Sequence, residues 1–214
     1  MSYIAERRQE ERERRRAEIL DAAEAVAAVV GWDDMTMDQV ARKARLSRAL
    51  LYVYFKDKND LLFGICERGL KALRQRFAEA VARHRVGLDQ LEALGRAYVA
   101  FSQEFPVYFD VLARCELMSP EDIHSGSNEE ACMICGDAVY RLMVETIETG
   151  VRDGSIRADI GDPKVVATVL WGFTHGVIQL ATNKANMLAH RGISNRELIE
   201  SALRMARRSA ASGS

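Results

Sequence analysis

Three helix-capping signals follow one another between residues 36 and 57 and restrict what this part of the chain can fold into. Thr36-Met37-Asp38-Gln39 matches a capping box, in which the threonine hydroxyl accepts a backbone N–H and the glutamine side chain bonds back to the threonine backbone. Ser47 and Asp57 are two further N-cap residues. Their spacing predicts two short helices joined by a tight turn, with a long helix beginning at Asp57.

The rest of the chain also has helical patterning. Ile19, Ala22 and Val26 recur at helical spacing until Gly31, which favours a left-handed stop. Only three prolines occur in 214 residues, and an interior proline costs a helix about 3 kcal/mol. A hydrophobic content of 48% is enough for a buried core. We therefore expect an all-α protein of about nine helices.

The charge of the chain argues for a local basic patch rather than a basic protein. The net charge is −1, so nucleic-acid binding would need a segment that is positive on its own. Residues 45–58 fit this requirement, since four basic residues stand against one acid and give a net charge of +3. The basic residues of the patch are Arg45, Arg48, Lys56 and Lys58, and the acid is Asp57.

Residues 36–58 resemble the signature of the TetR family of transcription regulators, whose core is a Leu-Tyr-x-Tyr-Phe-x-x-Lys run after a Ser-capped helix. Here the run is Leu51-Tyr52-Val53-Tyr54-Phe55-Lys56-Asp57-Lys58. The resemblance covers roughly the first quarter of the chain. It implies a helix-turn-helix DNA-binding domain over residues 1–60, with three helices, and a helical ligand-binding and dimerisation bundle over residues 61–214.

The resemblance also implies roles for individual residues. Arg48 and Ala49 would face base edges in the major groove, and Arg48 suits the paired acceptors of guanine. Phosphate contacts would come from Thr36, Ser47, Tyr52, Tyr54 and Lys58. Against this, one of the tyrosines could simply close the core, and Lys58 could be an ordinary surface lysine. Arg14, Arg15 and Arg16 fit a solvated helical extension better than a DNA-contacting arm.

The sequence departs from the family pattern at two positions. Arg45 and Ala49 stand where the family often has glycine. Arg45 should therefore take a backbone conformation that is less comfortable without glycine, unless the turn differs. Its charge lies close to the expected DNA surface, so we count Arg45 among the DNA-binding residues.

The stretch from Val165 to Asn183 carries no charged residue and approaches the length of a membrane span. Thr168, Thr174 and Gln179 within it are costly in lipid, and we expect instead a helix that is buried in the protein or in a homodimer. In the family the last two long helices usually form the dimer, which here means this helix and residues 193–206. Gly172 and Gly176 would let another backbone approach closely. Residues 171–176 also resemble the Trp-x-x-x-His-Gly element of one TetR group.

Mainly aromatic and sulfur-bearing residues of the middle helices and of residues 171–175 are candidate walls of a site for a hydrophobic or aromatic effector, although plain core packing fits each of them better when it is taken singly. The nine candidates are Tyr108, Phe109, Leu112, Cys115, Met118, Met133, Tyr140, Trp171 and His175.

The four cysteines and the lack of a signal-peptide pattern predict a cytoplasmic protein with free thiols. Cys132-x-x-Cys135 fits packed small hydrophobes better than a metal or redox site, so no metal or cofactor is expected. There is no phosphate-binding loop, nucleophile elbow or His-Glu-x-x-His motif, and we expect no enzyme. A small helical enzyme and a helical adaptor that does not bind DNA remain the alternatives to a ligand-released repressor at a palindromic operator.

Overall fold

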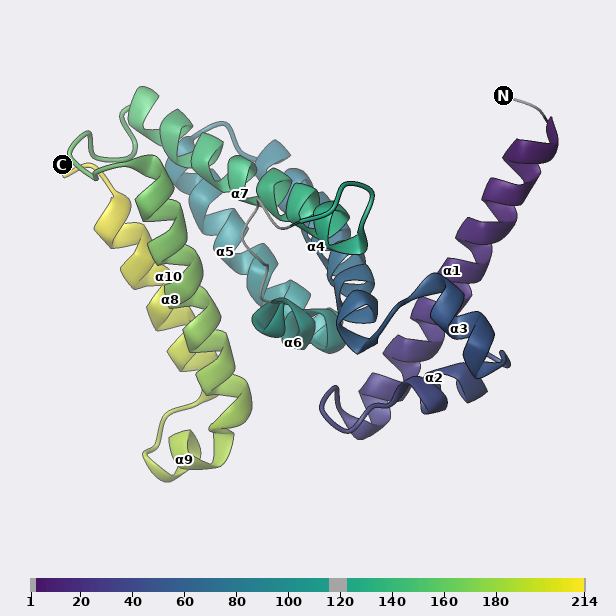
Figure 1. Ribbon diagram of the computed structural model, residues 1–214. Helices are drawn as coiled ribbons and strands as arrows, with labels where there is room; N and C mark the ends of the chain where they lie inside the picture. The colour runs from purple at the N-terminus through teal and green to yellow at the C-terminus, as the bar shows by residue number, and fades with distance from the viewer. Residues whose placement is uncertain (1–2, 116–122, 214) are drawn as a thin grey trace. The chain divides into compact units, whose positions relative to one another are not determined.

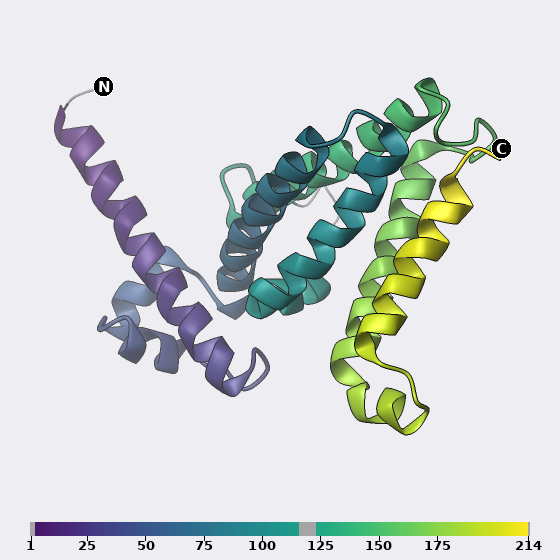
Figure 2. The ribbon, with the colours of Figure 1, turned by 180° about the vertical axis from the view of Figure 1, so that it is seen from behind.

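The computed structural model describes residues 3–115 and 123–213, and within these ranges its regular structure is helical (Figures 1 and 2). This confirms the all-α prediction. The helices are α1 (Tyr3–Val30), α2 (Met37–Lys43), α3 (Arg48–Tyr54), α4 (Lys58–Ala82), α5 (Gly87–Glu104), α6 (Pro106–Arg114), α7 (Asn128–Arg152), α8 (Pro163–Asn183), α9 (Ala185–His190) and α10 (Asn195–Ala210). The described residues form ten helices, whereas about nine were expected from the sequence. The additional helix is the short α9, which follows α8 after a single residue.

The chain forms two compact units. Unit 1 comprises residues 1–70 and 105–135, and unit 2 comprises residues 71–104 and 136–214. Helices α4 and α7 each continue from one unit into the other. The first unit is therefore larger than the predicted DNA-binding segment of residues 1–60. The predicted boundary at residue 60 separates a DNA-binding segment from a ligand-binding segment, whereas the two units are defined by how the chain packs. The boundary at residue 60 therefore stays a prediction.

The core of unit 1 holds the first three helices together. Ile19 and Leu20 of α1, Val40 of α2, Leu51 of α3 and Phe55, which caps the end of α3, are all fully buried in one apolar cluster. Helices as short as α2 and α3, with seven residues each, are marginal in water on their own. Their stability therefore comes from this shared core and from their caps.

All three predicted caps form. Thr36 Oγ1 accepts the Gln39 N–H at 3.3 Å, while Gln39 Oε1 accepts the Thr36 N–H at 2.7 Å. Ser47 Oγ accepts the Leu50 N–H at 3.2 Å, and Asp57 Oδ1 accepts the Asp60 N–H at 2.8 Å. The two short helices thus begin where the side-chain oxygens satisfy their first free amides.

The turn between α2 and α3 depends on a left-handed arginine. Arg45 has φ +56°, the one positive φ outside glycine in the described part of the chain. The Arg45 N–H bonds to the Arg42 carbonyl at 3.2 Å, and the Leu46 N–H bonds to the Ala41 carbonyl at 2.9 Å. These two bonds make a Schellman motif, which normally has glycine at the left-handed position. The strained conformation expected at Arg45 is confirmed.

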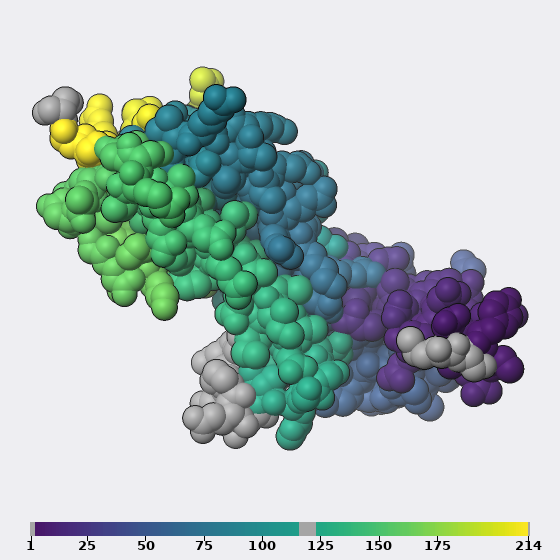
Figure 3. Space-filling view, turned by 90° about the horizontal axis from the view of Figure 1, so that it is seen from above, coloured from purple at the N-terminus to yellow at the C-terminus, as the bar shows by residue number. Residues whose placement is uncertain are grey.

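Unit 2 is built around α5, α8 and α10, which pack against one another. Leu203 of α10 and Ala167 of α8 are buried, and the ion pairs from Arg207 to Asp89 (2.7 Å) and Glu92 (2.8 Å) tie α10 to α5. Figure 3 shows the C-terminal residues, in yellow, beside green parts of unit 2, and an isolated bridge pairs Ala211 with Ile156 in the segment that follows α7. There the Arg157 N–H donates to the Ala210 carbonyl at 3.0 Å.

Helix α8 leaves an apolar face uncovered in the described structure. It is the one described helix long and apolar enough to cross a membrane, and only 17% of its most apolar window is buried. Exposed on it are Val165, Val169, Trp171, Phe173 and Leu180. A Cβ added at Gly172 or Gly176 would meet nothing within 4 Å. The expectation that this helix is buried therefore does not hold within the single chain.

The left-handed residue gives a stability prediction. Replacing Arg45 by glycine should stabilise the protein relative to replacing it by alanine by about 1 kcal/mol, because both variants lose the same side chain but only alanine retains the Cβ clash. Urea unfolding followed by circular dichroism measures the difference. Equal stability of the two variants would mean that the turn carries no backbone strain.

Candidate functional site

One face of α3 is anchored in the core and the opposite face lies in solvent. Leu51 is fully buried, whereas Arg48, Ala49 and Tyr52 are exposed. The three predicted groove-facing or phosphate-facing residues of α3 thus share one accessible surface. The exposed face also includes Leu50 and Val53, the latter 69% exposed.

Leu50 and Val53 were not among the residues predicted from the sequence to contact DNA. Apolar residues in an amphipathic pattern are normally assigned to the core, and α3 is too short to bury two faces. Apolar side chains on a groove-facing helix can contact the methyl group of thymine. Arg42 and Lys43 of α2 are exposed as well, and they add positive charge beside the predicted patch.

Arg48 is held by two neighbours. Its Nε lies 3.3 Å from Asp38 Oδ1 of α2, and its guanidinium carbon lies 5.6 Å from the centroid of the Tyr52 ring. Hydrogen bonding with Tyr52 and attraction to Asp38 raise the pKa of Arg48 above its ordinary value. The side chain therefore stays charged, and it is oriented along the exposed face before any partner binds.

The other predicted phosphate-binding residues differ in accessibility. Thr36, Arg45 and Ser47 are exposed, and the hydroxyls of Thr36 and Ser47 already cap α2 and α3. Tyr54 is half-buried and packs against the unit 1 core. This is the position expected of a tyrosine that closes the core rather than one that contacts a phosphate. Lys58 Nζ donates to the Asp33 carbonyl at 2.9 Å and lies 5.4 Å from the centroid of the Trp32 ring. Lys58 is thus half-buried, and these two contacts hold its side chain against the loop that follows α1.

The candidate effector residues fall into two groups. Tyr108, Phe109, Leu112, Cys115 and Met133 belong to unit 1; Tyr140, Trp171 and His175 belong to unit 2; Met118 lies outside the described residues. Within unit 1, Tyr108 stacks on Phe105 and donates its hydroxyl to Glu24 at 3.2 Å. Burial, followed by the Glu24 charge, raises the pKa of Tyr108 to about 12.

In unit 2, Trp171 and His175 meet around a tyrosine that was not predicted from the sequence. The Trp171 Nε1–H donates to the Tyr98 hydroxyl at 3.3 Å, and this hydroxyl lies 2.8 Å from His175 Nδ1. Burial raises the pKa of Tyr98 to about 12 and lowers the pKa of His175. Which of the two atoms donates in this hydrogen bond depends on the tautomer of His175. Tyr140 lies apart and donates to the Lys164 carbonyl at 2.7 Å.

Cys115 also has partners in unit 1. Its Sγ lies 3.6 Å from Cys132 Sγ, and hydrogen bonds from Cys132 and Cys66 lower its pKa. Cys132 therefore interacts with two sulfurs that are distant in sequence, those of Cys115 and Cys66. All four cysteines are free thiols, as predicted.

The lowered pKa of His175 gives a prediction about stability. The unfolded chain takes up a proton at His175 as the pH falls through about 6.5, whereas the folded chain resists it. Proton uptake then favours the unfolded state, so stability is lost below this pH until the folded histidine also titrates. His175→Gln should show a smaller loss of melting temperature on acidification than the wild type. A variant with the same pH dependence as the wild type would contradict a desolvated histidine.

Comparison with known proteins agrees with this geometry. A family model described as "Bacterial regulatory proteins, tetR family" matches residues 19–65, which include α2 and α3. The repressor NicS of Pseudomonas putida is 27% identical over 157 residues, 72% of this chain and 71% of NicS. The regulator BetI of Serratia proteamaculans is 40% identical over 67 residues, which cover 31% of this chain and only 32% of BetI.

A solved structure shares the fold of nearly the whole chain. The bacterial regulatory protein of the tetR family from Rhodococcus RHA1 has a TM-score of 0.70 at 19% identity, and the match covers 94% of this chain and 98% of that one. These relatives are transcription regulators rather than enzymes, as the sequence predicted. Residues 19–65 thus match the helix-turn-helix segment of the TetR regulators, and the chain as a whole shares the fold of a solved protein of that family.

Proposed function

We propose that this protein is a cytoplasmic homodimeric repressor, which binds a palindromic operator through α3 and is released by a hydrophobic or aromatic small molecule. The observation that carries the proposal is the exposed face of α3, where Arg48 lies charged and oriented beside Tyr52. NicS is named a transcriptional repressor, which supports repression rather than activation.

Arg48 is the residue that we assign to base recognition. A guanidinium fits the O6 and N7 acceptors of guanine, and such a contact is worth about 1–3 kcal/mol of discrimination. Thr36, Arg45, Ser47, Tyr52, Tyr54 and Lys58 are assigned to the phosphates, and Ala49 to a base edge. Lys58 would have to exchange its bond to the Asp33 carbonyl for a phosphate oxygen.

The exposed face of α8 is the proposed dimer surface. Val165, Val169, Phe173 and Leu180 form an apolar stripe on it, and the open positions at Gly172 and Gly176 allow a close approach. A second copy is a better partner than lipid, because α8 also carries Thr168, Thr174 and Gln179. A dimer is needed functionally, since helix-turn-helix proteins place two recognition helices about 34 Å apart on one face of DNA.

The Trp171–Tyr98–His175 cluster is the best-supported part of the proposed effector site. It combines aromatic surface with two polar groups, the Tyr98 hydroxyl and the His175 imidazole. Trp171 is 47% exposed, so part of this surface is accessible from solvent. We add Tyr98 to the predicted effector-binding residues of unit 2, which are Tyr140, Trp171 and His175. The predicted effector-binding residues of unit 1 remain candidates, but they do not form a comparable cluster of aromatic and polar side chains.

Binding sites selected from random duplex DNA test the function. The wild-type protein should enrich a palindrome. Arg48→Ala should weaken binding to that palindrome by about 1–3 kcal/mol while leaving binding to unrelated DNA nearly unchanged. Asp38→Asn is the matched variant, because it frees Arg48 without removing it and should bind at least as tightly as the wild type. A wild-type protein that enriches no sequence would overturn the proposed repressor.

Sedimentation velocity tests the dimer. Val169→Glu places a charge in the centre of the proposed surface at a side chain that is 62% exposed in the single chain, so it should give a folded monomer. Val29→Glu, at an exposed valine of α1, is the matched control and should remain dimeric. A dimer that survives Val169→Glu unchanged would place the interface elsewhere.

A further inference from the structure

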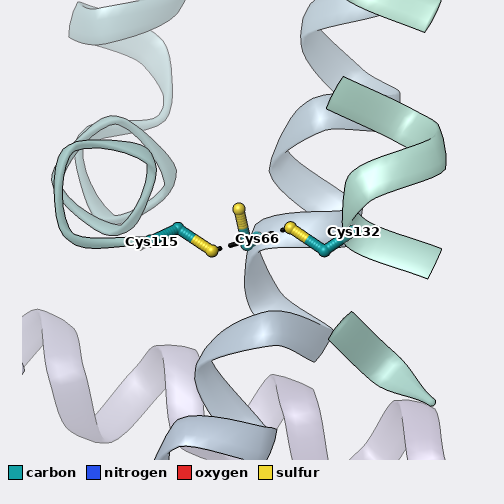
Figure 4. A group of neighbouring side chains, drawn as sticks. All are labelled: Cys66, Cys115 and Cys132. Carbon is teal, nitrogen blue, oxygen red and sulfur yellow. Dashed lines mark hydrogen bonds between the residues drawn. The ribbon is translucent and has the colours of Figure 1, made fainter. Parts of the chain in front are cut away.

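Three cysteines from distant parts of the chain converge in unit 1. Cys66 lies on α4, Cys115 caps the end of α6, and Cys132 lies on α7 (Figure 4). Their three sulfur atoms lie within 4.8 Å of one another, and those of Cys115 and Cys132 are 3.6 Å apart. Cys66 and Cys132 are buried and Cys115 is half-buried. Three thiols are thus already grouped closely enough to bind one ion.

The surroundings of the sulfurs are apolar. Cys66 and Cys132 belong to the buried hydrophobic cluster of unit 1, and Cys115 packs against the same cluster beside Val111 and Leu112. A net charge left in such a place is strongly unfavourable unless it is paired. The charge of the complete complex therefore helps to decide which ion the site can hold.

The number and type of ligand atoms narrow the choice further. Among residues 3–115 and 123–213 the group offers three candidate ligand atoms, all of them sulfur. Structural zinc takes four ligands in a tetrahedron, and three thiolates would leave a zinc complex negatively charged. Monovalent copper is soft enough for thiolates, but with three of them it would leave a larger negative charge.

A trivalent ion meets both conditions, since three thiolates neutralise it and complete its coordination. We propose that Cys66, Cys115 and Cys132 form a binding site for a trivalent thiophilic metalloid, of which arsenite is the probe. Arsenite in neutral water is the uncharged As(OH)3. Each thiol proton leaves with one hydroxyl of arsenic as water, so that three As–S bonds replace three As–O bonds and three waters are released. No electron is transferred and no net charge is buried.

Occupation of the site should affect DNA binding, a consequence that rests on the proposed repressor function. The buried cluster that contains Cys66 and Cys132 also contains Leu51 and Phe55, which anchor α3. Three As–S bonds would fix α4, the end of α6 and α7 to one another within unit 1. The packing under α3 then changes with occupancy, and the affinity for the selected palindrome should change with it.

The experiment measures binding without DNA. The purified protein, reduced with a phosphine so that no competing thiol is present, is mixed with arsenite and examined by native mass spectrometry and by titration of reactive thiols. We expect one arsenic for each chain, and of the four thiols only Cys135 should remain reactive. Cys66→Ser, Cys115→Ser and Cys132→Ser should each lose this binding.

Cys135→Ser is the matched control, because Cys135 lies one helical turn from Cys132 but outside the group. It should bind arsenite as the wild type does. Circular dichroism and melting show whether each variant is folded, and Cys115→Ser, at the half-buried position, is the least disruptive of the three.

Several outcomes would overturn the proposal. They are no arsenic bound by the wild type, binding that persists in folded Cys115→Ser, and tighter binding of copper(I) or zinc(II) than of arsenite in parallel titrations. Binding of arsenite with no change in affinity for the selected palindrome would retain the site and remove only its regulatory role. Failure to select any palindrome would count against the repressor function and leave the metalloid site standing.

Discussion

The burial of Leu51 is the contact on which the proposed DNA surface depends. A helix of seven residues does not hold its shape in water, so α3 exists because Leu51, with Phe55 at its end, completes the core of unit 1. Fixing one side chain of so short a helix also fixes which residues face outward. Arg48, Ala49 and Tyr52 are exposed while Leu51 is fully buried.

Interactions within a few residues were predictable from the sequence, and interactions across the chain were not. The caps at Thr36 and Ser47 and the left-handed Arg45 each depend on hydrogen bonds to residues no more than a few positions away. By contrast, Tyr98 and His175 are 77 positions apart, and Cys115 and Cys132 are 17 apart on different helices. Spacing alone drew attention to Cys135, which has the helical interval to Cys132 but lies outside the cluster.

The ion pair between Asp38 and Arg48 is exposed, so Arg48 can exchange Asp38 for another partner at low cost. Both side chains are more than half exposed, and exposed pairs of this kind contribute about 0–1 kcal/mol. A bidentate bond to guanine is worth about 1–3 kcal/mol of discrimination. Asp38 therefore orients Arg48 in the free protein at a low energetic cost of separation, which is compatible with the proposed contact between Arg48 and guanine.

Helix α8 connects the proposed effector residues to the proposed dimer surface inside a single unit. Trp171 and His175, four residues apart, lie on the face that reaches Tyr98 of α5. Val169 and Phe173 lie on another face, together with the open glycine positions. A helix is too stiff for one face to move without the other. A ligand that displaces the Tyr98 hydroxyl from His175 would therefore also shift the proposed dimer surface, and no separate relay between the two proposed sites is required.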